Sequence, residues 1–219
     1  MRASPRPLLA TLVLGGAALA SGAAQAGEIY LQAGLPGYGL GYAHPLSPSL
    51  TLRGDYVTLG TRDKDTTEEG IAYQGQLKAK RTALFADWYP FAGSFRFSLG
   101  LTSNQYQLTL DAAGAGQVIN VGGTSYTLGA GDGLTVQVKY PSTMPYFGLG
   151  WGHQMGSGLR FSLDLGAGIG KPTVTATGRG QLANPAAQAD IDREVAELRD
   201  GVGKVKVLPQ ISLAIGYSF

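Results

Sequence analysis

The feature that most constrains this chain is a period-two alternation between an apolar face and a face of glycine and small polar residues. From residue 205 to residue 219, Val, Pro, Ile, Leu, Tyr and Phe hold the odd positions, and the even positions are mostly Gln, Ser, Ala and Gly. The same alternation returns over residues 95–102, 147–152 and 159–170. Because successive side chains of a β-strand point to opposite faces, these segments are predicted to be strands with one apolar face.

The glycine content indicates the surroundings of the second face of these strands. The chain has 34 glycines, well above the average usage of about 7%, and many stand inside the alternating segments. A soluble sandwich would present a charged, solvated face there, whereas small side chains fit the crowded interior of a narrow closed barrel. The chain is therefore predicted to be all-β: a closed antiparallel transmembrane β-barrel whose apolar face meets lipid.

The connections predict the topology. Residues 47–49, 92–94 and 156–158 are expected to form tight turns, and residues 61–70, 111–133 and 178–203 to form long polar loops. Outer-membrane barrels combine short periplasmic turns, long extracellular loops and an even strand count. The whole chain has seven barrel strands if residues 28–46 form one strand. It has eight if this segment divides at Leu35-Pro36-Gly37, which is the preferred interpretation.

Two of the long loops carry structure of their own. Gly122-Gly123 between residues 118–121 and 124–128 predicts a two-residue hairpin. Asn184-Pro185 predicts a helix start, and Ile191, Val195, Leu198 and Val202 recur at helical spacing. We expect a short amphipathic helix over residues 185–200, resting on the extracellular rim of the barrel.

The first 26 residues predict export. Arg2 and Arg6 precede an uncharged apolar run over residues 8–20, and Ala24-Gln25-Ala26 is a small-x-small cleavage pattern. We expect cleavage near Ala26, a mature barrel domain over residues 27–219, and location in the outer membrane of a Gram-negative bacterium. The signal contains two of the 17 basic residues and none of the 15 acidic ones, so the mature chain is neutral. No nucleic-acid partner is expected, and without cysteines no disulfide or thiolate metal site.

Several blocks of the chain resemble one family. They are LPGYGLGY at residues 35–42, FADWYPF at 85–91, Phe95-Arg96, PYFGLGWG at 145–152, GKPTV at 170–174 and the acidic helix before the last strand. Together they resemble the CarO-type small outer-membrane barrels, a family linked to uptake of ornithine and basic amino acids and to carbapenem susceptibility. The resemblance implies an eight-stranded barrel with a narrow or occluded lumen, and transport of small amino-acid solutes by analogy.

Strand phase places charges inside the barrel. If the Phe, Leu and Trp positions face lipid, six charged residues near the periplasmic turns face the lumen. These residues are Arg53, Asp55, Asp87, Arg96, Arg160 and Asp164. Charges in so narrow a space are expected to pair. They form either a salt-bridged plug that holds the barrel shut or a gate and selectivity ring for charged solutes.

Aromatic residues cluster at the periplasmic strand ends. Trp88, Tyr89, Phe91, Phe95 and Trp151 are predicted to form an interfacial aromatic girdle. The terminal Gly216, Tyr217 and Phe219 resemble the signal read by the outer-membrane assembly machinery. Lys78, Lys80 and Arg81 are expected to extend from the outer wall toward headgroups, where lipopolysaccharide phosphates would be partners.

Catalysis and metal binding are not expected. The two histidines, His44 and His153, are predicted by phase to point toward lipid headgroups, away from luminal serines. Asp63, Asp65, Glu68 and Glu69 lack the spacing of an EF-hand loop and are interpreted as a solvated acidic loop. No cofactor is expected. Three functions stay open: a narrow porin-like route, a structural or adhesive barrel with a closed lumen, and, remotely, a lipid-modifying enzyme.

Overall fold

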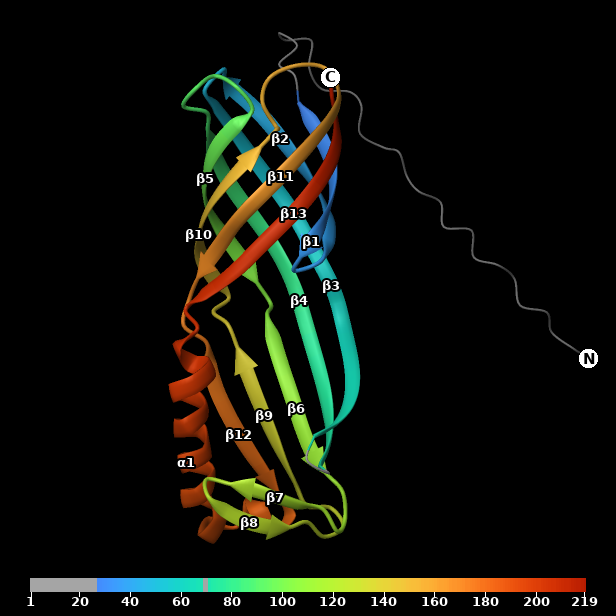
Figure 1. Ribbon diagram of the computed structural model, residues 1–219, viewed down its shortest axis with the longest axis vertical. Helices are drawn as coiled ribbons and strands as arrows, with labels where there is room; N and C mark the ends of the chain where they lie inside the picture. The colour runs from blue at the N-terminus through green and yellow to red at the C-terminus, as the bar shows by residue number, and fades with distance from the viewer. Residues whose placement is uncertain (1–26, 69–70) are drawn as a thin grey trace, which may run out of the picture.

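The computed structural model describes residues 27–68 and 71–219. The predicted signal, residues 1–26, lies outside the described residues. The molecule is elongated, with a closed barrel at one end and a module of strands, hairpin and helix at the other (Figure 1). No helix in the part of the chain that the structure describes is long and apolar enough to cross a bilayer.

Eight antiparallel strands form a closed ring. They are β1 (Glu28–Leu35), β2 (Tyr38–Ser47), β3 (Leu50–Glu68), β4 (Ile71–Trp88), β5 (Phe95–Asn104), β10 (Thr143–Trp151), β11 (Gly158–Ile169) and β13 (Val207–Ser218). The ring closes where β1 pairs with β13, from Glu28 opposite Ser218 to Leu35 opposite Ile211. The predicted barrel, its eight strands and the division of residues 28–46 into two strands are confirmed.

The alternation of the sequence becomes the two sides of the barrel wall. Large apolar side chains point outward, among them Leu101, Phe161 and Leu213 at 62–72% exposure. Many residues on the inner face are small because large side chains from other strands reach across the lumen. A side chain added at Gly41 would collide with the ring of Tyr30, and one added at Gly166 would collide with the hydroxyl of Tyr146. Glycine on one strand thus makes room for a tyrosine from another.

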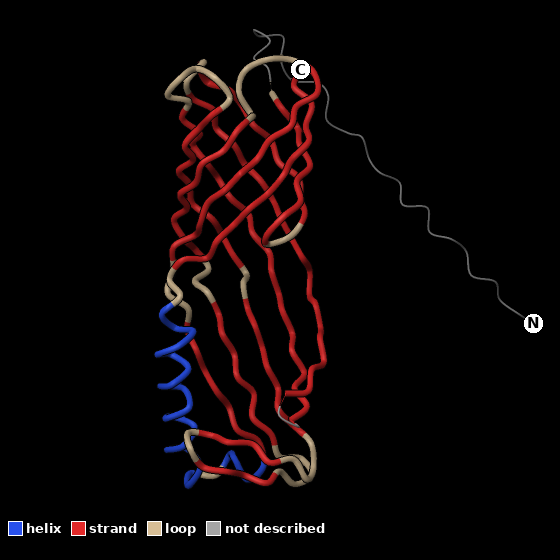
Figure 2. The backbone as a smooth tube through the Cα atoms, viewed as in Figure 1, coloured by secondary structure: helices blue, strands red, loops and turns tan. Residues whose placement is uncertain are grey.

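Beyond the barrel, five strands continue as an open sheet. The outer parts of β3 and β4 pair with each other, and β6 (Gln107–Ala113), β9 (Gly133–Lys139) and β12 (Thr173–Arg179) follow in the order β3-β4-β6-β9-β12. Figure 2 shows these strands running on from the barrel wall. We call the chain beyond the barrel the distal module (residues 60–68, 71–78, 105–140 and 171–206).

The predicted loop at residues 61–70 is wrong over residues 61–68, which are strand, and residues 69 and 70 lie outside the described residues. β3 extends to Glu68 and β4 begins at Ile71. Backbone hydrogen bonds hold this ladder whatever the side chains are, and Gln76 Nε2 donates to Asp63 Oδ1 at 2.9 Å across it. The run of charged residues was interpreted as a loop, although charged side chains are tolerated on a strand that is solvated on both faces.

The predicted hairpin and helix are both present. β7 (Val118–Val121) and β8 (Thr124–Thr127) join through Gly122-Gly123, whose φ values of 55° and 88° suit glycine. Helix α1 (Pro185–Gly201) lies between two short 3-10 turns, η1 (Gly180–Ala183) and η2 (Val202–Lys204).

The predicted place of α1 on the barrel rim is wrong. β12 ends at the far tip of the distal module, so the chain must return to the barrel before β13. Helix α1 spans about 25 Å of that return, at 1.5 Å for each of its 17 residues, and runs alongside β12 (Figure 1). Its buried face consists of Ala187, Ile191 and Val195, while Val202, predicted to share that face, is 44% exposed in η2.

Helix and hairpin enclose an apolar core in the tip of the distal module. Ile191 and Val195 of α1 meet Ile119 and Val121 of β7 over the inner face of the sheet. The other members of this cluster are Ala112, Leu128, Leu134, Leu182 and Ala187. The module tip is therefore a packed unit and not a set of loose loops.

We predict that Ile191→Asp releases α1 from the sheet without opening the barrel. An unpaired carboxylate in this cluster costs several kcal/mol, and hydrogen exchange should report loss of protection across α1. Ala196→Asp, which adds the same charge at an exposed position of the same helix, is the control and should keep wild-type protection. Equal protection in Ile191→Asp and wild type would contradict the described packing.

Candidate functional site

Four charged side chains from four strands meet inside the barrel. Arg53 of β3 donates from Nε to Asp87 Oδ2 of β4 at 2.7 Å and from Nη2 to Asp164 Oδ1 of β11 at 3.0 Å. Arg96 of β5 donates from Nη2 to the same Asp164 oxygen at 2.6 Å, and its Nε lies 3.3 Å from Asp87 Oδ2. Two cations thus share two anions. We call these four residues the lumen plug.

The lumen plug is buried and almost fully hydrogen-bonded. The side chains of Arg53, Asp87 and Arg96 are at most 2% exposed, and that of Asp164 is 9% exposed. Ser98 donates to Asp87 at 2.5 Å, and Arg96 Nη1 donates to the carbonyl of Gly152 at 2.9 Å. Because removal of one member would leave an uncompensated buried charge, the arrangement holds the four strands together across the lumen.

A second ion pair lies beside the plug, toward the distal module. Arg81 Nη2 donates to both oxygens of Asp55, at 2.9 and 2.8 Å, and Gln32 donates to Asp55 Oδ2 at 2.9 Å. Arg81 also donates to Gln210 of β13. The aromatic ring of Phe85 lies against both Arg53 and Arg81, at 4.5 and 5.6 Å from their guanidinium carbons.

Arg81 corrects the sequence analysis. It was predicted to extend outward with Lys78 and Lys80, but it is 5% exposed and faces the lumen. Strand parity contained the signal, since Arg81 shares the odd phase of Phe85 and Asp87 while the two exposed lysines occupy even positions. The residue was misplaced because the three basic residues were treated as one cluster.

Arg160 was predicted to join the luminal charges and does not. It stands two residues after the start of β11, at the level of the turn, and is half-buried. Its Nη2 donates to the carbonyl of Met155 at 3.5 Å, and it makes no ion pair within residues 27–68 and 71–219. The phase of Arg160 was right, but its depth along the barrel axis was wrong.

His153 was predicted to face lipid and is instead buried at 1% exposure. Positive φ values at Gly152 (96°) and His153 (57°) turn the chain after β10 back over the barrel end. There, His153 Nδ1 lies 3.0 Å from Glu28 Oε1 and 3.5 Å from Ser162 Oγ, beside the ring of Tyr30. His44 lies on the outer side, 3.4 Å from the hydroxyl of Tyr42.

The His153 contacts do not form a catalytic triad. A serine nucleophile and its supporting carboxylate must use different nitrogens of the histidine ring, whereas Glu28 and Ser162 both approach Nδ1. Nε2 is buried without a hydrogen-bond partner among the described residues. The prediction that this chain is not an enzyme stays a prediction.

The cavity beside the lumen plug is small. A cavity of about 10 Å³ lies among Arg53, Arg81, Tyr146, Asp164 and Gln210, which is about the room that one water molecule occupies. Side chains from at least six strands close the barrel at this level. The geometry is therefore that of a filled barrel.

The predicted aromatic girdle is present, except that Phe97 belongs to it and Tyr89 does not. Trp88, Phe91 and Trp151 are exposed on the outer wall, and the Phe95 ring contacts the Trp151 ring at 5.2 Å. Phe97, which the sequence analysis missed, lies 5.1 Å from Phe95 and 5.8 Å from Trp88 between ring centroids. Tyr89 was predicted to belong here, but it is 2% exposed, and its hydroxyl donates to the Gly152 carbonyl at 3.1 Å. Its odd phase, shared with Asp87, turns it inward.

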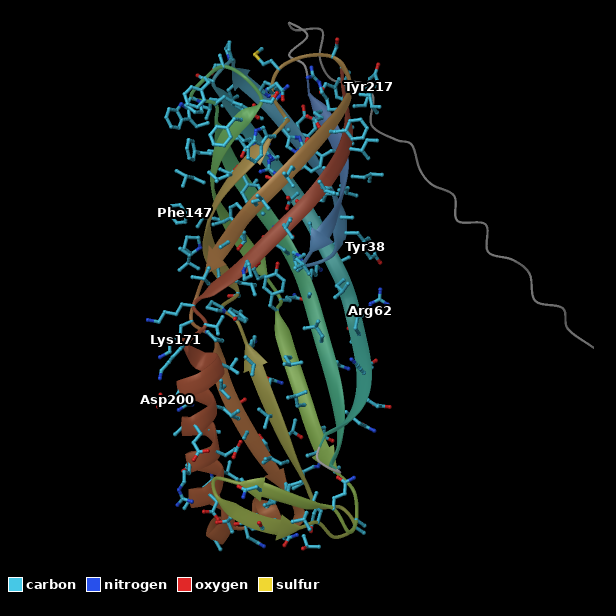
Figure 3. The ribbon with its side chains drawn as sticks, viewed as in Figure 1. Tyr38, Arg62, Phe147, Lys171, Asp200 and Tyr217 are labelled. Carbon is cyan, nitrogen blue, oxygen red and sulfur yellow. The ribbon has the colours of Figure 1, made fainter. Side chains whose placement is uncertain are left out.

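The C-terminal residues complete the outer wall. Tyr217 and Phe219 are each 60% exposed, and Tyr217 points away from the barrel (Figure 3). Gly216 has the opposite phase, where a side chain would collide with Glu28 and Tyr30. The backbone N–H of Phe219 donates to the Gly27 carbonyl at 3.0 Å and extends the pairing between the chain ends.

These features define a small eight-stranded closed barrel with an apolar outer face and a filled, charge-paired lumen. Its likeness to solved structures is specific: the chain superimposes on Acinetobacter baumannii CarO2 with a TM-score of 0.60 and 19% identity, over 89% of this chain and 98% of that one. For Acinetobacter baumannii CarO, the TM-score is 0.58 and the identity 19%, over 88% and 97% of the two chains. The chain has the CarO-type fold, which confirms the predicted resemblance at the level of fold.

Neither the protein-family models nor the curated protein sequences give a match to this chain. The likeness is thus carried by the three-dimensional arrangement, including the strands beyond the barrel, and not by close sequence identity.

We predict that Arg53→Ala destabilises the barrel by about 3–5 kcal/mol, because Asp87 and Asp164 keep buried charges that lose a partner. Denaturant unfolding of protein refolded in lipid vesicles measures this free energy. The control is Arg179→Ala, since Arg179 pairs with Asp111 at 2.8 Å on the solvated distal module with a side chain 48% exposed. That change should cost less than about 1 kcal/mol. Equal losses for the two variants would contradict a buried plug.

Acid is predicted to loosen the distal module. Burial raises the pKa of Asp111, but hydrogen bonds from Arg179 and Thr135 outweigh it, so the pKa lies below the usual 3.8. Backbone N–H donation from Gln181 lowers the pKa of Asp132, and the Tyr126 hydroxyl lowers that of Asp190. A depressed folded-state pKa contributes stability that is present above the unfolded pKa and lost as pH falls through the folded one. The loosening is therefore expected below about pH 4.

A spin label at Ala196→Cys on α1 reports this change, since the chain has no native cysteine. Its mobility should rise as pH falls from about 6 to about 2.5, and Asp132→Asn should raise the mobility at neutral pH. Identical spectra across this range would show that the three carboxylates do not hold the module.

Proposed function

We propose that this chain is an integral outer-membrane protein, exported by residues 1–26 and cleaved near Ala26. The outward apolar wall and the girdle of Trp88, Phe95 and Trp151 suit a bilayer and its interface. The terminal Gly216, Tyr217 and Phe219 would be read by the outer-membrane assembly machinery. In this orientation the short turns are periplasmic, and the distal module is extracellular, next to lipopolysaccharide.

We further propose that the barrel serves as a sealed anchor that displays the distal module. The observation that carries this proposal is the lumen plug, in which Arg53, Asp87, Arg96 and Asp164 pair across the lumen at 0–9% side-chain exposure. To open a path, each arginine must leave its carboxylates in a space with room for about one water. Separating buried ion pairs without solvent costs several kcal/mol, so the closed arrangement is the stable one.

The distal module is the part of the molecule that the sealed barrel would display outside the cell. Its tip has its own apolar core, and its charged residues are arranged in surface pairs such as Arg179–Asp111 and Arg193–Asp190. A folded projection of this kind is suited to adhesive or structural contacts outside the cell, whereas disordered loops would lose more conformational entropy on binding.

A gated, porin-like route for small amino-acid solutes is the second candidate. The observation that favours this route is that charged side chains in the lumen share hydrogen-bond partners. Asp164 Oδ1 accepts hydrogen bonds from both Arg53 and Arg96. A zwitterionic solute carries the same two charges as an Arg–Asp pair and would offer each member a replacement partner. The CarO-type resemblance implies such solutes, ornithine and other basic amino acids among them.

An enzymatic role is not proposed. Glu28 and Ser162 compete for one nitrogen of His153, and the other histidine, His44, is on the outer wall beside Tyr42. His153 Nδ1 lies 3.5 Å from Ser162 Oγ, but no carboxylate among the described residues bonds the other ring nitrogen, so a serine–histidine–carboxylate triad is not formed there.

Osmotic swelling of liposomes separates the two candidates. With the wild-type protein refolded and its folding verified by heat-modifiable gel mobility, glycine, ornithine, arginine and glutamate should enter no faster than into protein-free liposomes. Arg96→Ala removes a fully buried member of the plug and should raise the swelling rate. Arg160→Ala removes an arginine that is outside the plug and should behave as wild type.

Faster swelling of wild-type liposomes with the amino acids would favour the gated route over the sealed anchor. Unchanged swelling in folded Arg96→Ala would show that the plug is not what closes the lumen.

A further inference from the structure

An apolar pocket lies where the barrel meets the distal module. Its volume is about 380 Å³, within the range of small-molecule sites. We call it the side pocket. Its apolar lining includes Leu35, Leu77, Leu108, Val138, Tyr140 and Leu208.

The side pocket exists because the apolar inner face of the distal sheet is longer than its cover. At the module tip, α1 and the β7–β8 hairpin bury Ala112 and Leu134. Nearer the barrel neither α1 nor the hairpin lines the pocket, and Leu77 and Leu108 remain 41% and 37% exposed. Water would contact apolar side chains inside a concave surface there, which is unfavourable unless an apolar group fills it.

The pocket opens sideways because β1, β2 and β13 do not extend beyond the barrel as β3 and β4 do. β1 ends at Leu35 and β13 begins at Val207, whereas the neighbouring β3 continues far beyond them. Figure 3 shows this step in the wall: Tyr38 marks the end of the β1–β2 hairpin, and Arg62 on β3 lies beyond it. Leu35, which lines the pocket, is 62% exposed, and Val207, the neighbour of the lining residue Leu208, is 53% exposed. The opening is therefore continuous with the apolar outer wall of the barrel.

Two hydrogen-bonding groups line the barrel side of the pocket. Tyr106 and Gln210 are 6% and 5% exposed, and the Tyr106 hydroxyl and the Gln210 Nε2 have no hydrogen-bond partner among the described residues. The side-chain amide oxygen Oε1 of Gln210 already accepts a hydrogen bond from Arg81 Nη1. Tyr140 differs, because its hydroxyl donates to the Val205 carbonyl at 3.3 Å. The pocket thus has an apolar wall and two buried donors that lack a partner among the described residues.

We propose that the side pocket binds an unbranched aliphatic chain that carries a hydrogen-bond-accepting head, such as the carboxyl or ester of an acyl group. The chain enters between Leu35 and Val207 and lies along Leu77, Leu108 and Val138. The head accepts hydrogen bonds from Tyr106 and Gln210. This binding requires no passage through the barrel, so it does not depend on whether the lumen conducts.

Photocrosslinking tests the proposal on the full mature protein in lipid nanodiscs. One arm uses a ten-carbon fatty acid with a terminal diazirine, added from solution. The other uses a phospholipid with the same diazirine in one acyl chain, built into the disc. Peptide mass spectrometry then locates the crosslinks. We expect labels on the segments that contain Leu77, Leu108 and Val138, and the two arms distinguish a free fatty acid from a membrane lipid as the source of the chain.

Two matched pairs of variants make the result specific. Leu108→Trp fills the pocket and should reduce its labelling at least tenfold, whereas Leu101→Trp, on the outer barrel wall at 62% exposure, should leave it unchanged. Tyr106→Phe removes one free donor and should weaken competition by unlabelled decanoate about three- to tenfold, the effect of one hydrogen bond. Tyr140→Phe removes a hydroxyl that is already bonded and should have less effect.

Saturable labelling of the three segments in either arm, lost in Leu108→Trp, supports the proposal. Labelling confined to the outer wall in both arms overturns it, as does equal pocket labelling in Leu108→Trp and Leu101→Trp. Wild-type competition in Tyr106→Phe would overturn the assigned position of the head. None of these outcomes depends on liposome swelling, so the failure of the sealed-anchor proposal would be seen separately.

Discussion

The absence of room for solvent inside an eight-stranded barrel is the constraint on which the rest of the structure depends. Charges in so narrow a lumen must be neutralised by one another, and Arg53, Asp87, Arg96 and Asp164 achieve this by sharing carboxylate oxygens. The long side chains that reach across the lumen require small residues opposite them, which is why glycine alternates with large apolar residues along the wall. The composition, the outer apolar face and the closed interior therefore have one cause.

The same economy of space shapes the region beyond the barrel. Where β1, β2 and β13 end, the wall no longer closes, and the remaining strands keep an apolar inner face without a full set of opposing residues. Helix α1 and the β7–β8 hairpin cover the far part of that face. The part next to the barrel becomes a pocket with a lateral opening. The open pocket thus lies next to the closed lumen because the strands differ in length.

Strand parity allowed the barrel, its eight strands and most luminal charges to be predicted from the sequence. Arg81 and Tyr89 were predictable too, since they share the phase of Asp87, but their neighbours in sequence suggested an exterior place. His153 was not predictable by parity, because the positive φ of Gly152 and of His153 itself breaks the alternation. The strand at residues 61–68 was missed, because residues 61–65 are exposed on both faces and carry no hydrophobic alternation. The side pocket forms where some strands end before others. The alternation of apolar and polar residues does not predict where each strand ends, so the pocket could not be predicted from it.

The claim that the lumen is sealed by paired charges is tested most directly by chemical access to the plug itself. Ser98 bonds Asp87 inside it and is 1% exposed, and the chain contains no native cysteine that would interfere. In folded Ser98→Cys protein, a small charged thiol reagent should fail to label the cysteine over hours, whereas Ser157→Cys on the exposed turn should label within minutes. Comparable labelling rates at the two positions would contradict a sealed lumen.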